Sequence, residues 1–360
     1  MRKDRWRRHA GWPKRVENVQ VQIRLENVVK SVITNCVIPI ALAFASCVSS
    51  NAQEAVPIGI TAAKILNFKL GESNNDFGRL EFIGGLELKS DNREFGGISG
   101  FRFFPDRTNF IAVTDNGIAI NGTFKRDVAG ALDDVLLADI SPLPDPKGNL
   151  FTRKRDSDAE ALVLVGNRAF VAFENNDRIN AYTIANGKIY GDPVSVFPEV
   201  KSLRLSHNKG LEALAKSPPN RQDFEFIAIT EESLNAAGNH RAFLLSDGNI
   251  GELSIIRIDK FGVTDADFLA NGDLIILERF HSTFSGHKIR LRQIKGETIV
   301  PGAILDGEVI LEADTGFRID NFESLDISVD EKSETYLTLI SDDNFSMLQN
   351  TILLEFKYLQ

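Results

Sequence analysis

The chain has 360 residues, of which 43% are hydrophobic and 25% are charged, and its formal net charge is −9. This composition is typical of a globular protein that is long enough for one large domain or two smaller ones. An acidic protein is poorly suited to nucleic acid or anionic lipid, so we expect neither as a partner, whereas cations are suitable.

The first 52 residues have the organisation of a secretory leader. Residues 1–30 are basic, an apolar run follows over 32–48, and small residues come next. This order predicts a signal peptide that is cleaved after Ala52, leaving Gln53 as the first mature residue. Polar residues and a proline interrupt the apolar run, which is marginal for a membrane span of about 20 residues. We therefore expect no stable membrane span after cleavage.

Both cysteines, Cys36 and Cys47, lie in this leader. The mature part, 53–360, then has no disulfide, thiol nucleophile or cysteine-based metal site. Lipoprotein processing at Cys47 is the alternative, although Phe44, three residues before it, fits that signal poorly. Residues 1–52 carry nine Lys/Arg and three Asp/Glu, so their removal leaves a net charge of −15. We expect a strongly acidic protein that is periplasmic or secreted.

From residue 56 onward, short apolar or alternating runs bounded by Gly, Asn, Asp or Pro predict β-strands. A short helix is predicted near 231–238. In chain order, the predicted strands are 80–88, 109–114, 161–173, 224–230, 242–245, 253–258, 273–278, 288–293, 309–312, 335–340 and 351–358. Many short strands with tight turns predict an all-β sandwich, barrel or propeller.

An internal repeat favours the propeller. Five segments share one order of acidic or small residue, apolar pair, turn, apolar strand and acidic pair, and they start near residues 96, 157, 208, 263 and 321. Their period of about 50–60 residues suits a four-stranded antiparallel blade. We predict a single domain over 53–360, a six-bladed β-propeller with five blades as the alternative. Strands around 66–88 and 351–358 would complete the sixth blade and remove the open sheet edge.

Carboxylates recur at two phases of this repeat. Because the first strand of a propeller blade lines the channel, we predict that they form two circles around the axis. At the start of each unit stand Ser99, Glu160, Glu212, Asp265 or Asp267, and Glu323. After the next strand stand Asp115, Glu174, Glu231, Glu278 and Asp342. Such circles would repel one another unless cations lie between them, so the pattern predicts a cation site.

The same segments resemble a known family. The motifs are FGGISGFRF…AVTDNG, DAEAL…FVAFENNDRI, NKGLEAL, GDLIILERF, NFESLDIS and LISDDNF, over about residues 95–358. In this order they resemble the bacterial phytase-like family, often labelled "esterase-like activity of phytase". The resemblance implies a β-propeller-like fold, an exported protein and, through distant similarity to calcium-dependent propeller phytases, hydrolysis of phosphoric esters. It supplies no established catalytic residues.

Calcium binding is the first functional hypothesis, because calcium takes six to eight oxygen ligands that several loops can supply together. In a metal-dependent phosphoric-ester hydrolase, the cation would neutralise the phosphate and activate water. The predicted metal ligands are Asp115, Glu160, Glu174, Glu212, Glu231, Glu323, Asp342 and Asp343, with Asn116, Asn175, Glu232 and Asn344 beside them. The predicted substrate contacts are His207, Lys209 and Arg279, with Arg178 as a further candidate. For each carboxylate, the alternative is a turn cap, an ion pair or a solvated side chain.

Two other functions remain open. One is a carboxylic-ester hydrolase, in which Ser99 would be the nucleophile and His207 the candidate base. Such an enzyme would need the motif G-x-S-x-G, and GGISG around Ser99 lacks that spacing. A non-catalytic propeller that binds structural calcium is the alternative to an enzyme. His281 and His287 are six residues apart with no third metal ligand nearby, which fits a substrate-contacting loop better than zinc. In each case we expect a monomer that binds a divalent cation and a small-molecule ester or phosphate.

Overall fold

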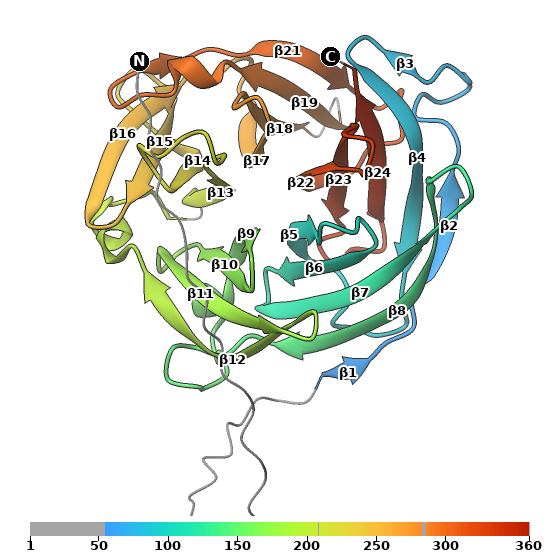
Figure 1. The fold of residues 1–360 in the computed structure, drawn as a ribbon, viewed down its shortest axis with the longest axis horizontal. Helices are drawn as coiled ribbons and strands as arrows, with labels where there is room; N and C mark the ends of the chain where they lie inside the picture. Colours follow the sequence, from blue (N-terminus) through green and yellow to red (C-terminus); the bar gives the residue numbers. More distant parts are fainter. Residues whose placement is uncertain (1–54, 208, 283–285, 360) are drawn as a thin grey trace, which may run out of the picture. The chain divides into compact units, whose positions relative to one another are not determined.

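The computed structural model describes residues 55–207, 209–282 and 286–359. The described residues all belong to one compact unit. The predicted leader and its cleavage site lie outside the described residues. In this unit, five β-sheets stand around a common axis as the blades of a β-propeller (Figure 1). No helix within these described ranges is long and apolar enough to cross a membrane.

Each blade starts at the axis with one strand and continues outward. From the axis outward, blade 1 contains β5 Ile98–Phe103, β6 Asn109–Thr114, β7 Ile118–Arg126, β8 Leu132–Pro142 and β1 Val56–Pro57. Blade 2 contains β9 Ala159–Val165, β10 Arg168–Phe173, β11 Arg178–Ala185 and β12 Lys188–Val196. Blade 3 contains β13 Leu211–Lys216, β14 Phe226–Leu234, β15 His240–Ser246, β16 Asn249–Ile255 and β20 Ile304–Leu305, the last pairing parallel to β16.

The last two blades continue this pattern. Blade 4 contains β17 Gly262–Phe268, β18 Leu274–Ser282, β19 Gly286–Ile294 and β21 Glu308–Ala313. Blade 5 contains β22 Asn321–Val329, β23 Thr335–Asp342, β24 Thr351–Tyr358, β4 Leu80–Lys89 and β2 Thr61–Ile65, with β3 Asp76–Phe77 beside β4. Among the described residues, three short helices lie in the connections: α1 Lys154–Ser157, η1 Pro198–Ser202 and η2 Gly296–Thr298.

The predicted all-β propeller is confirmed, and it has the five blades of the alternative and not six. The segments assigned to a sixth blade belong to blade 5, because β24 pairs with β23 on one side and with β4 on the other. An early strand, β4, and the last described strand, β24, thus lie side by side in one sheet. This closure leaves no unpaired strand where the two ends of the propeller meet.

Two local predictions need correction. The predicted strand 161–173 is a hairpin, β9 and β10, whose turn contains Gly166 with a positive φ of 58°. The predicted helix near 231–238 is wrong, since β14 runs on to Leu234 and a turn follows. The Oδ1 atom of Asn235 accepts the N–H of Ala237 at 2.9 Å and that of Asn239 at 3.1 Å. Such Asx turns compete with helix formation and favour a hairpin.

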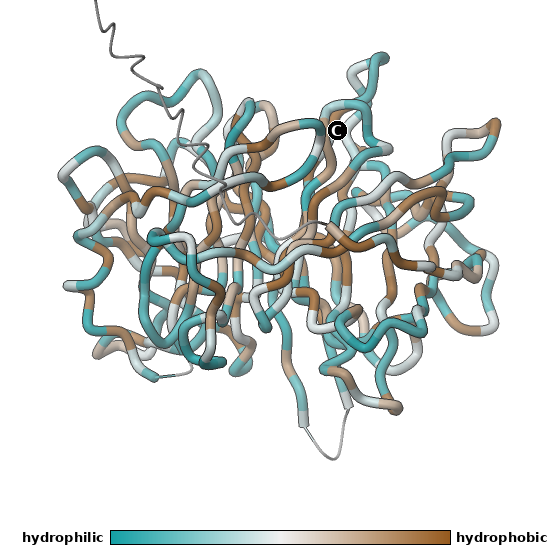
Figure 2. Tube along the Cα trace, turned by 90° about the horizontal axis from the view of Figure 1, so that it is seen from below, coloured by the Kyte–Doolittle hydropathy of each residue, from teal (hydrophilic) through white to brown (hydrophobic). Residues whose placement is uncertain are grey.

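Hydrophobic side chains fill the space between neighbouring blades. Figure 2 shows hydrophobic segments at mid-height and hydrophilic loops on both faces. Phenylalanine accounts for much of this packing: Phe170 of blade 2 lies 4.8 Å from Phe226 of blade 3, measured between ring centroids. Burying one such side chain stabilises the fold by about 1.5–3 kcal/mol. The abundance of phenylalanine is therefore explained by the core.

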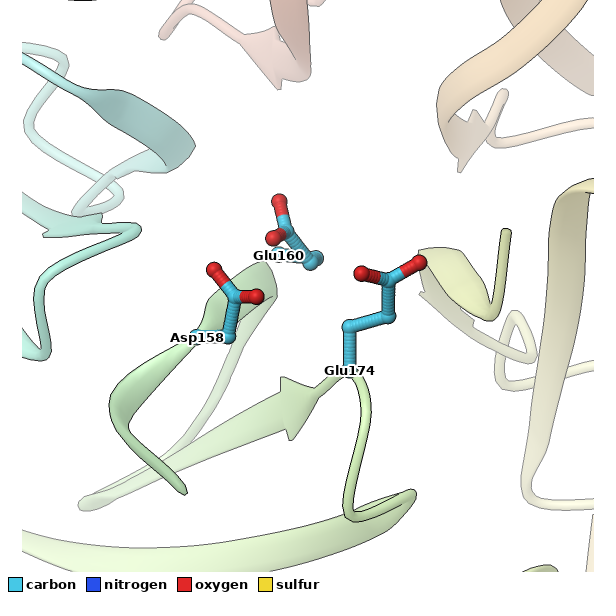
Figure 3. A group of neighbouring side chains, drawn as sticks. All are labelled: Asp158, Glu160 and Glu174. Carbon is cyan, nitrogen blue, oxygen red and sulfur yellow. The ribbon is translucent and has the colours of Figure 1, made fainter. Parts of the chain in front are cut away.

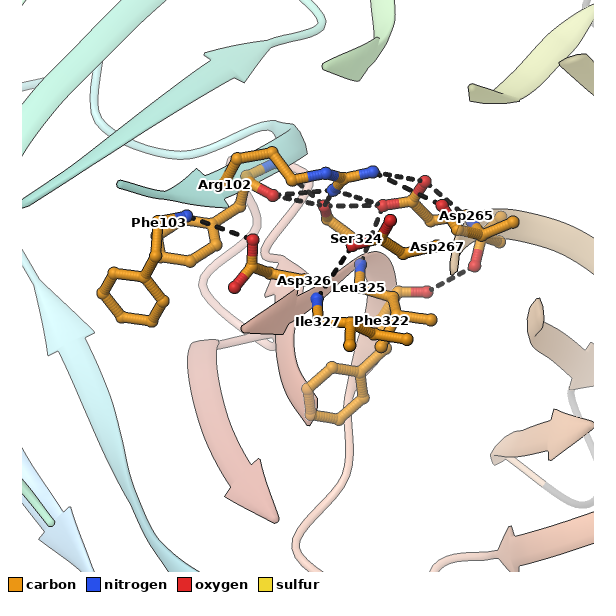
Figure 4. Close-up of polar contacts among 12 residues, drawn as sticks. Arg102, Phe103, Asp265, Asp267, Phe322, Ser324, Leu325, Asp326 and Ile327 are labelled. Atoms are coloured by element: carbon orange, nitrogen blue, oxygen red, sulfur yellow. Dashed lines mark hydrogen bonds and ion pairs between the residues drawn. The ribbon is translucent and has the colours of Figure 1, made fainter. Parts of the chain in front are cut away.

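The innermost strands are sheet edges. Acidic side chains from the preceding blade accept hydrogen bonds from some of their backbone N–H groups (Figure 4). The Oδ1 atom of Asp326 in β22 accepts the N–H of Phe103 in β5 at 3.2 Å. The Oδ2 atom of Asp267 in β17 accepts the N–H of Ile327 in β22 at 2.9 Å. An unsatisfied N–H in this buried position would cost stability. These carboxylates therefore join blades.

A buried arginine completes this arrangement, which we call the Arg102 cluster (Arg102, Asp265, Asp267, Ser324 and Asp326). Arg102 donates to both carboxylate oxygens of Asp265, at 2.8 and 3.2 Å. The Ser324 hydroxyl donates to the same carboxylate at 2.9 Å. The bidentate pair connects blade 1 to blade 4 through blade 5, so we assign the cluster a structural role.

Candidate functional site

Each of the five innermost strands has a β-bulge at the same register position. A bulge leaves one residue without a cross-strand partner and redirects its side chain, and bulges are frequent beside active sites. The five residues passed over by the pairing are Ser99, Glu160, Glu212, Thr264 and Glu323. We call them the bulge ring. Three of the five are glutamates, all predicted as axial from the repeat.

A second ring lies on the second strand of each blade or directly after it. Each member lies opposite the residue that stands two positions before the bulge residue of the same blade. It either pairs with that residue in the sheet or donates its backbone N–H to that residue's carbonyl. The members are Asp115, Glu174, Glu231, Arg279 and Asp342. Four of the five are acidic and one is basic. The second ring therefore contains its own counter-cation.

In blade 4 the residues predicted for the two ring positions were wrong. The ring positions are held by Thr264 and Arg279, and not by Asp265 or Asp267 and Glu278. Glu278 forms a fully buried bidentate pair with Arg292, at 2.7 and 3.0 Å. The two aspartates belong to the Arg102 cluster. Because strand neighbours face opposite ways, an error of one residue moves a side chain from the axis into the blade.

Arg279 connects acids from two other blades. Its guanidinium donates to Glu231 at 3.0 Å and to Glu323 at 2.5 Å, and it also bonds to the Oδ1 atom of Asn321. Burial alone would lower the pKa of Arg279, but Glu323 and Glu231 outweigh burial and raise it. This arginine therefore stays charged and holds blades 3, 4 and 5 together at the axis.

On the blade 2 side of the rings, three carboxylates converge (Figure 3). One oxygen from each of Asp158, Glu160 and Glu174 lies within 4.8 Å of the others. Glu174 also accepts the backbone N–H of Gly210 at 2.8 Å, and Asp158 pairs with Lys154 at 2.6 Å. We call Asp158, Glu160 and Glu174 the axial triad. Together they can supply at least three ligands to a hard cation.

Four carboxyl groups of the rings, those of Glu160, Glu174, Glu212 and Asp342, resist ionisation. Burial first, and then repulsion by neighbouring carboxylates, raises the pKa of Glu174 to about 7 and that of Asp342 to about 8. The same causes raise the pKa of Glu160 and of Glu212. The neighbours of Glu212 that raise its pKa are Glu160, Glu231, Glu174 and Glu323. Carboxylates from several blades thus repel one another across the axis.

A basic cleft opens beside the rings. It has a volume of about 930 Å³ and shares Glu231 and Arg279 with the second ring. Its basic lining side chains are Lys209, Arg257, Lys260, Arg279, His281 and His287. Lys209 and Arg257 both pair with Glu232. More cations than carboxylates line this cleft, so it suits an anionic ligand next to the acidic axis.

The remaining predicted residues occupy several environments. Asp115 pairs with Lys154 at 2.7 Å, and Asp343 accepts the N–H of Gly97 at 3.2 Å. His207 is exposed and is not among the residues that line the cleft. Arg178 lies 4.0 Å from the Phe173 ring centroid and donates to backbone carbonyls, so its contacts are structural.

Sequence reasoning missed three residues that the structure brings to this region: Asp158, Lys154 and Arg257. Asp158 precedes Glu160 by two residues in SDAEAL, and alternation along a strand could have indicated it. Nothing in the local sequence marks Lys154 or Arg257, because both act through contacts with other segments.

A profile of the phytase-like family, described as esterase-like activity of phytase, matches residues 93–345. The chain belongs to this family. The match covers parts of all five blades, all ten ring positions and the axial triad. No curated protein matches this phytase-like chain.

Solved structures with a partial likeness to the phytase-like chain include three proteins with sugar-related names. An oxidoreductase described as a glucose dehydrogenase from Thermus thermophilus is 10% identical, with a TM-score of 0.37, over 72% of this chain and 97% of that one. A PQQ-bound aldose sugar dehydrogenase from Streptomyces coelicolor is 11% identical, with a TM-score of 0.35, over 76% and 98%. A protein described as a 6-phosphogluconolactonase from Bacteroides uniformis is 14% identical, with a TM-score of 0.36, over 81% and 95%. Likenesses this distant carry no assignment of function.

Proposed function

We propose that this phytase-like propeller is a calcium-dependent phosphoric-ester hydrolase. The single observation that carries the proposal is that a basic cleft opens at the mostly acidic second ring and shares Glu231 and Arg279 with it. A phosphate ester needs positive groups for its oxygens and a nearby cation to polarise the reacting centre.

The axial triad fits calcium by donor type and by spacing. Calcium–oxygen bonds of about 2.3–2.6 Å allow two ligands of one ion to lie at most about 5 Å apart, and the triad oxygens lie within 4.8 Å. The Oδ1 atoms of Asn175 and Asp115 are also buried and have no hydrogen-bond partner within the described ranges. Buried oxygens without donors are costly, which supports a bound cation nearby.

The chain's own residues have separate roles in this proposal. Asp158, Glu160 and Glu174 would hold calcium, which would neutralise phosphate charge and polarise water. Lys209, Arg257 and Arg279 would bind the phosphate oxygens and orient the ester. Arg279 also pairs with both Glu231 and Glu323, which maintains the shape of the axis.

The direct test is a hydrolysis assay on the purified, chelator-treated protein. Phosphate monoesters and carboxylate esters are offered with and without calcium. We expect phosphate release that needs calcium and that falls about 100-fold in Glu160→Gln and in Arg257→Gln, the scale expected for loss of one stabilising group. The matched control is Arg241→Gln, because Arg241 pairs with Glu252 and does not line the cleft.

Two other outcomes would replace the proposal. Carboxylate-ester hydrolysis that survives chelation and needs Ser99 would identify a serine esterase; in the structure, the Ser99 hydroxyl donates to the Gly97 carbonyl at 3.5 Å. Absence of turnover together with a calcium-dependent rise in melting temperature would identify a binding protein with a structural ion. We also propose export to the periplasm or the medium as a monomer, which fractionation and gel filtration would test.

A further inference from the structure

Two histidines at the mouth of the basic cleft face one another. His281 in β18 and His287 in β19 are register partners in the same hairpin, and their ring centroids are 4.5 Å apart. Both line the cleft. The proposed hydrolysis uses neither of them.

One imidazole nitrogen of this pair is unsatisfied. The Nδ1 atom of His287 is shielded from solvent and has no hydrogen-bond partner in the part of the chain that the structure describes. A shielded polar atom without a partner costs free energy unless a ligand binds it. The neighbouring ring that could share such a ligand is His281.

The spacing of the two rings suits a shared metal ion. Each nitrogen–metal bond is about 2.0–2.1 Å for zinc, and cross-strand partners have Cβ atoms about 5 Å apart, so neighbouring imidazoles can reach one ion. Two imidazoles bound to one tetrahedral ion have centroids about 5 Å apart by this geometry. The observed separation of 4.5 Å is close to that value.

We propose that His281 and His287 bind a borderline divalent transition-metal ion, of the class of zinc, nickel or copper, at the mouth of the cleft. Imidazole nitrogen suits these ions, whereas calcium prefers the carboxylate oxygens of the axial triad. The site is therefore separate from the calcium site and does not depend on it.

The coordination shell would be completed from outside the chain. The nearby carboxylate of Asp320 already accepts N–H groups of Asn321 and Asn350, both at 2.9 Å. It is thus committed to the backbone. Two protein ligands leave coordination positions open to the cleft, where water or an oxyanion can bind.

The test is calorimetric titration of the chelator-treated full-length protein with zinc chloride and, separately, with calcium chloride. We expect one zinc ion per chain, with affinity reduced at least about tenfold in His281→Asn and in His287→Asn. Calcium binding should be unchanged in both variants. The matched control is His207→Asn, because His207 is exposed and does not line the cleft. Copper-loaded protein should show imidazole nitrogen coupling in its paramagnetic resonance spectrum, and the His281→Asn/His287→Asn double variant should lose it.

Several results would overturn this site. The first is that the wild-type protein binds none of zinc, nickel and copper. The second is that the wild type and the double variant bind zinc equally. The third is that zinc binding is lost in Glu160→Gln but kept in the double variant. Melting temperatures show whether each variant is folded. Because zinc binding is measured without substrate, failure of the hydrolase proposal leaves this result interpretable, and the reverse also holds.

Discussion

Arg279 occupies in blade 4 the register position that Glu231 occupies in blade 3, and its guanidinium donates to the Glu231 carboxylate at 3.0 Å. One repeat thus supplies the cation that the other repeats require. A ring of like charges at this position would be strongly destabilising, so one basic member allows the acidic members to remain close together.

Replacing Arg279 should therefore destabilise the metal-free protein. For Arg279→Gln we expect a loss of about 3 kcal/mol in the free energy of unfolding at pH 7, because two partly buried carboxylates lose their partner. Urea denaturation in the presence of a chelator measures it. Arg79→Gln removes an exposed pair with Glu308 and should cost less than about 1 kcal/mol. Equal stability of Arg279→Gln and wild type would refute the role of this arginine.

Removing one ligand of the axial triad should abolish stabilisation by calcium. At a free calcium concentration about 100 times the dissociation constant, the wild type should gain about 2.7 kcal/mol. In Glu160→Gln and Glu174→Gln the gain should fall toward zero, and a glutamine at 174 can still accept the N–H of Gly210. Thermal unfolding with and without calcium provides the measurement. The exposed Glu252→Gln is the control and should keep the full gain.

The Arg102 cluster should make stability fall as the pH rises. Burial, followed by repulsion from Asp267, raises the pKa of Asp326 to about 7. The folded state therefore holds this proton more tightly than the unfolded state, in which the pKa is about 4. The stabilisation is complete below about pH 4 and is lost as the pH rises through about 7.

Asp326→Asn should remove this dependence. We expect the free energy of unfolding of the variant, minus that of the wild type, to be about 2 kcal/mol higher at pH 8 than at pH 5. Urea titrations at the two pH values test this difference. Asp330→Asn is the control: burial raises the pKa of Asp330, but bonds from the N–H groups of Glu334 and Lys332 outweigh it and lower the pKa. The stabilisation from this carboxylate is complete above about pH 4 and is lost only at lower pH, so the substitution should cost the same stability at pH 5 and at pH 8.

Gly97 should tolerate no side chain. Its φ is 61°, and an added Cβ would lie 2.5 Å from the Oδ1 atom of Asp115 and 2.6 Å from the Phe345 ring. We expect Gly97→Ala to cost about 3 kcal/mol, combining backbone strain with overpacking. Gly187→Ala has a similar φ of 75° with open space around it, so it isolates the strain, at about 1 kcal/mol. Equal losses in the two variants would show that the contact with Asp115 is unimportant.

The sequence was sufficient for the fold class, since the repeat period and the turn residues both indicate blades. It was insufficient for the number of blades, because a strand at either end of the chain can complete an existing sheet or build a new one. The outer strands β8 and β12 were not predicted. Leu136, Leu137, Tyr190 and Val194 are exposed in them, so hydrophobic alternation does not follow burial there.

The residues at the axis could be predicted in blades 1, 2, 3 and 5 but not in blade 4. In VTDADF the bulge falls at Thr264, one residue before the first aspartate, and composition does not reveal where a bulge lies. The basic cleft could be predicted only in part. Lys209 and Arg279, which line it, were predicted as substrate contacts, but Arg257 and Lys260 were not. These two residues lie in the connection between β16 and β17, and only tertiary packing brings them beside Lys209 and Arg279.

The pairing of β24 with β4 has a consequence for biosynthesis. Strand β4 is made before β5 to β23, yet its partner β24 is made after them. Until β24 has been made, Leu86 and its neighbours keep an uncovered edge, and blade 5 cannot be completed. A chain that lacks β24 should therefore expose the edges of β4 and β23, and it should aggregate more readily than the chain that contains it.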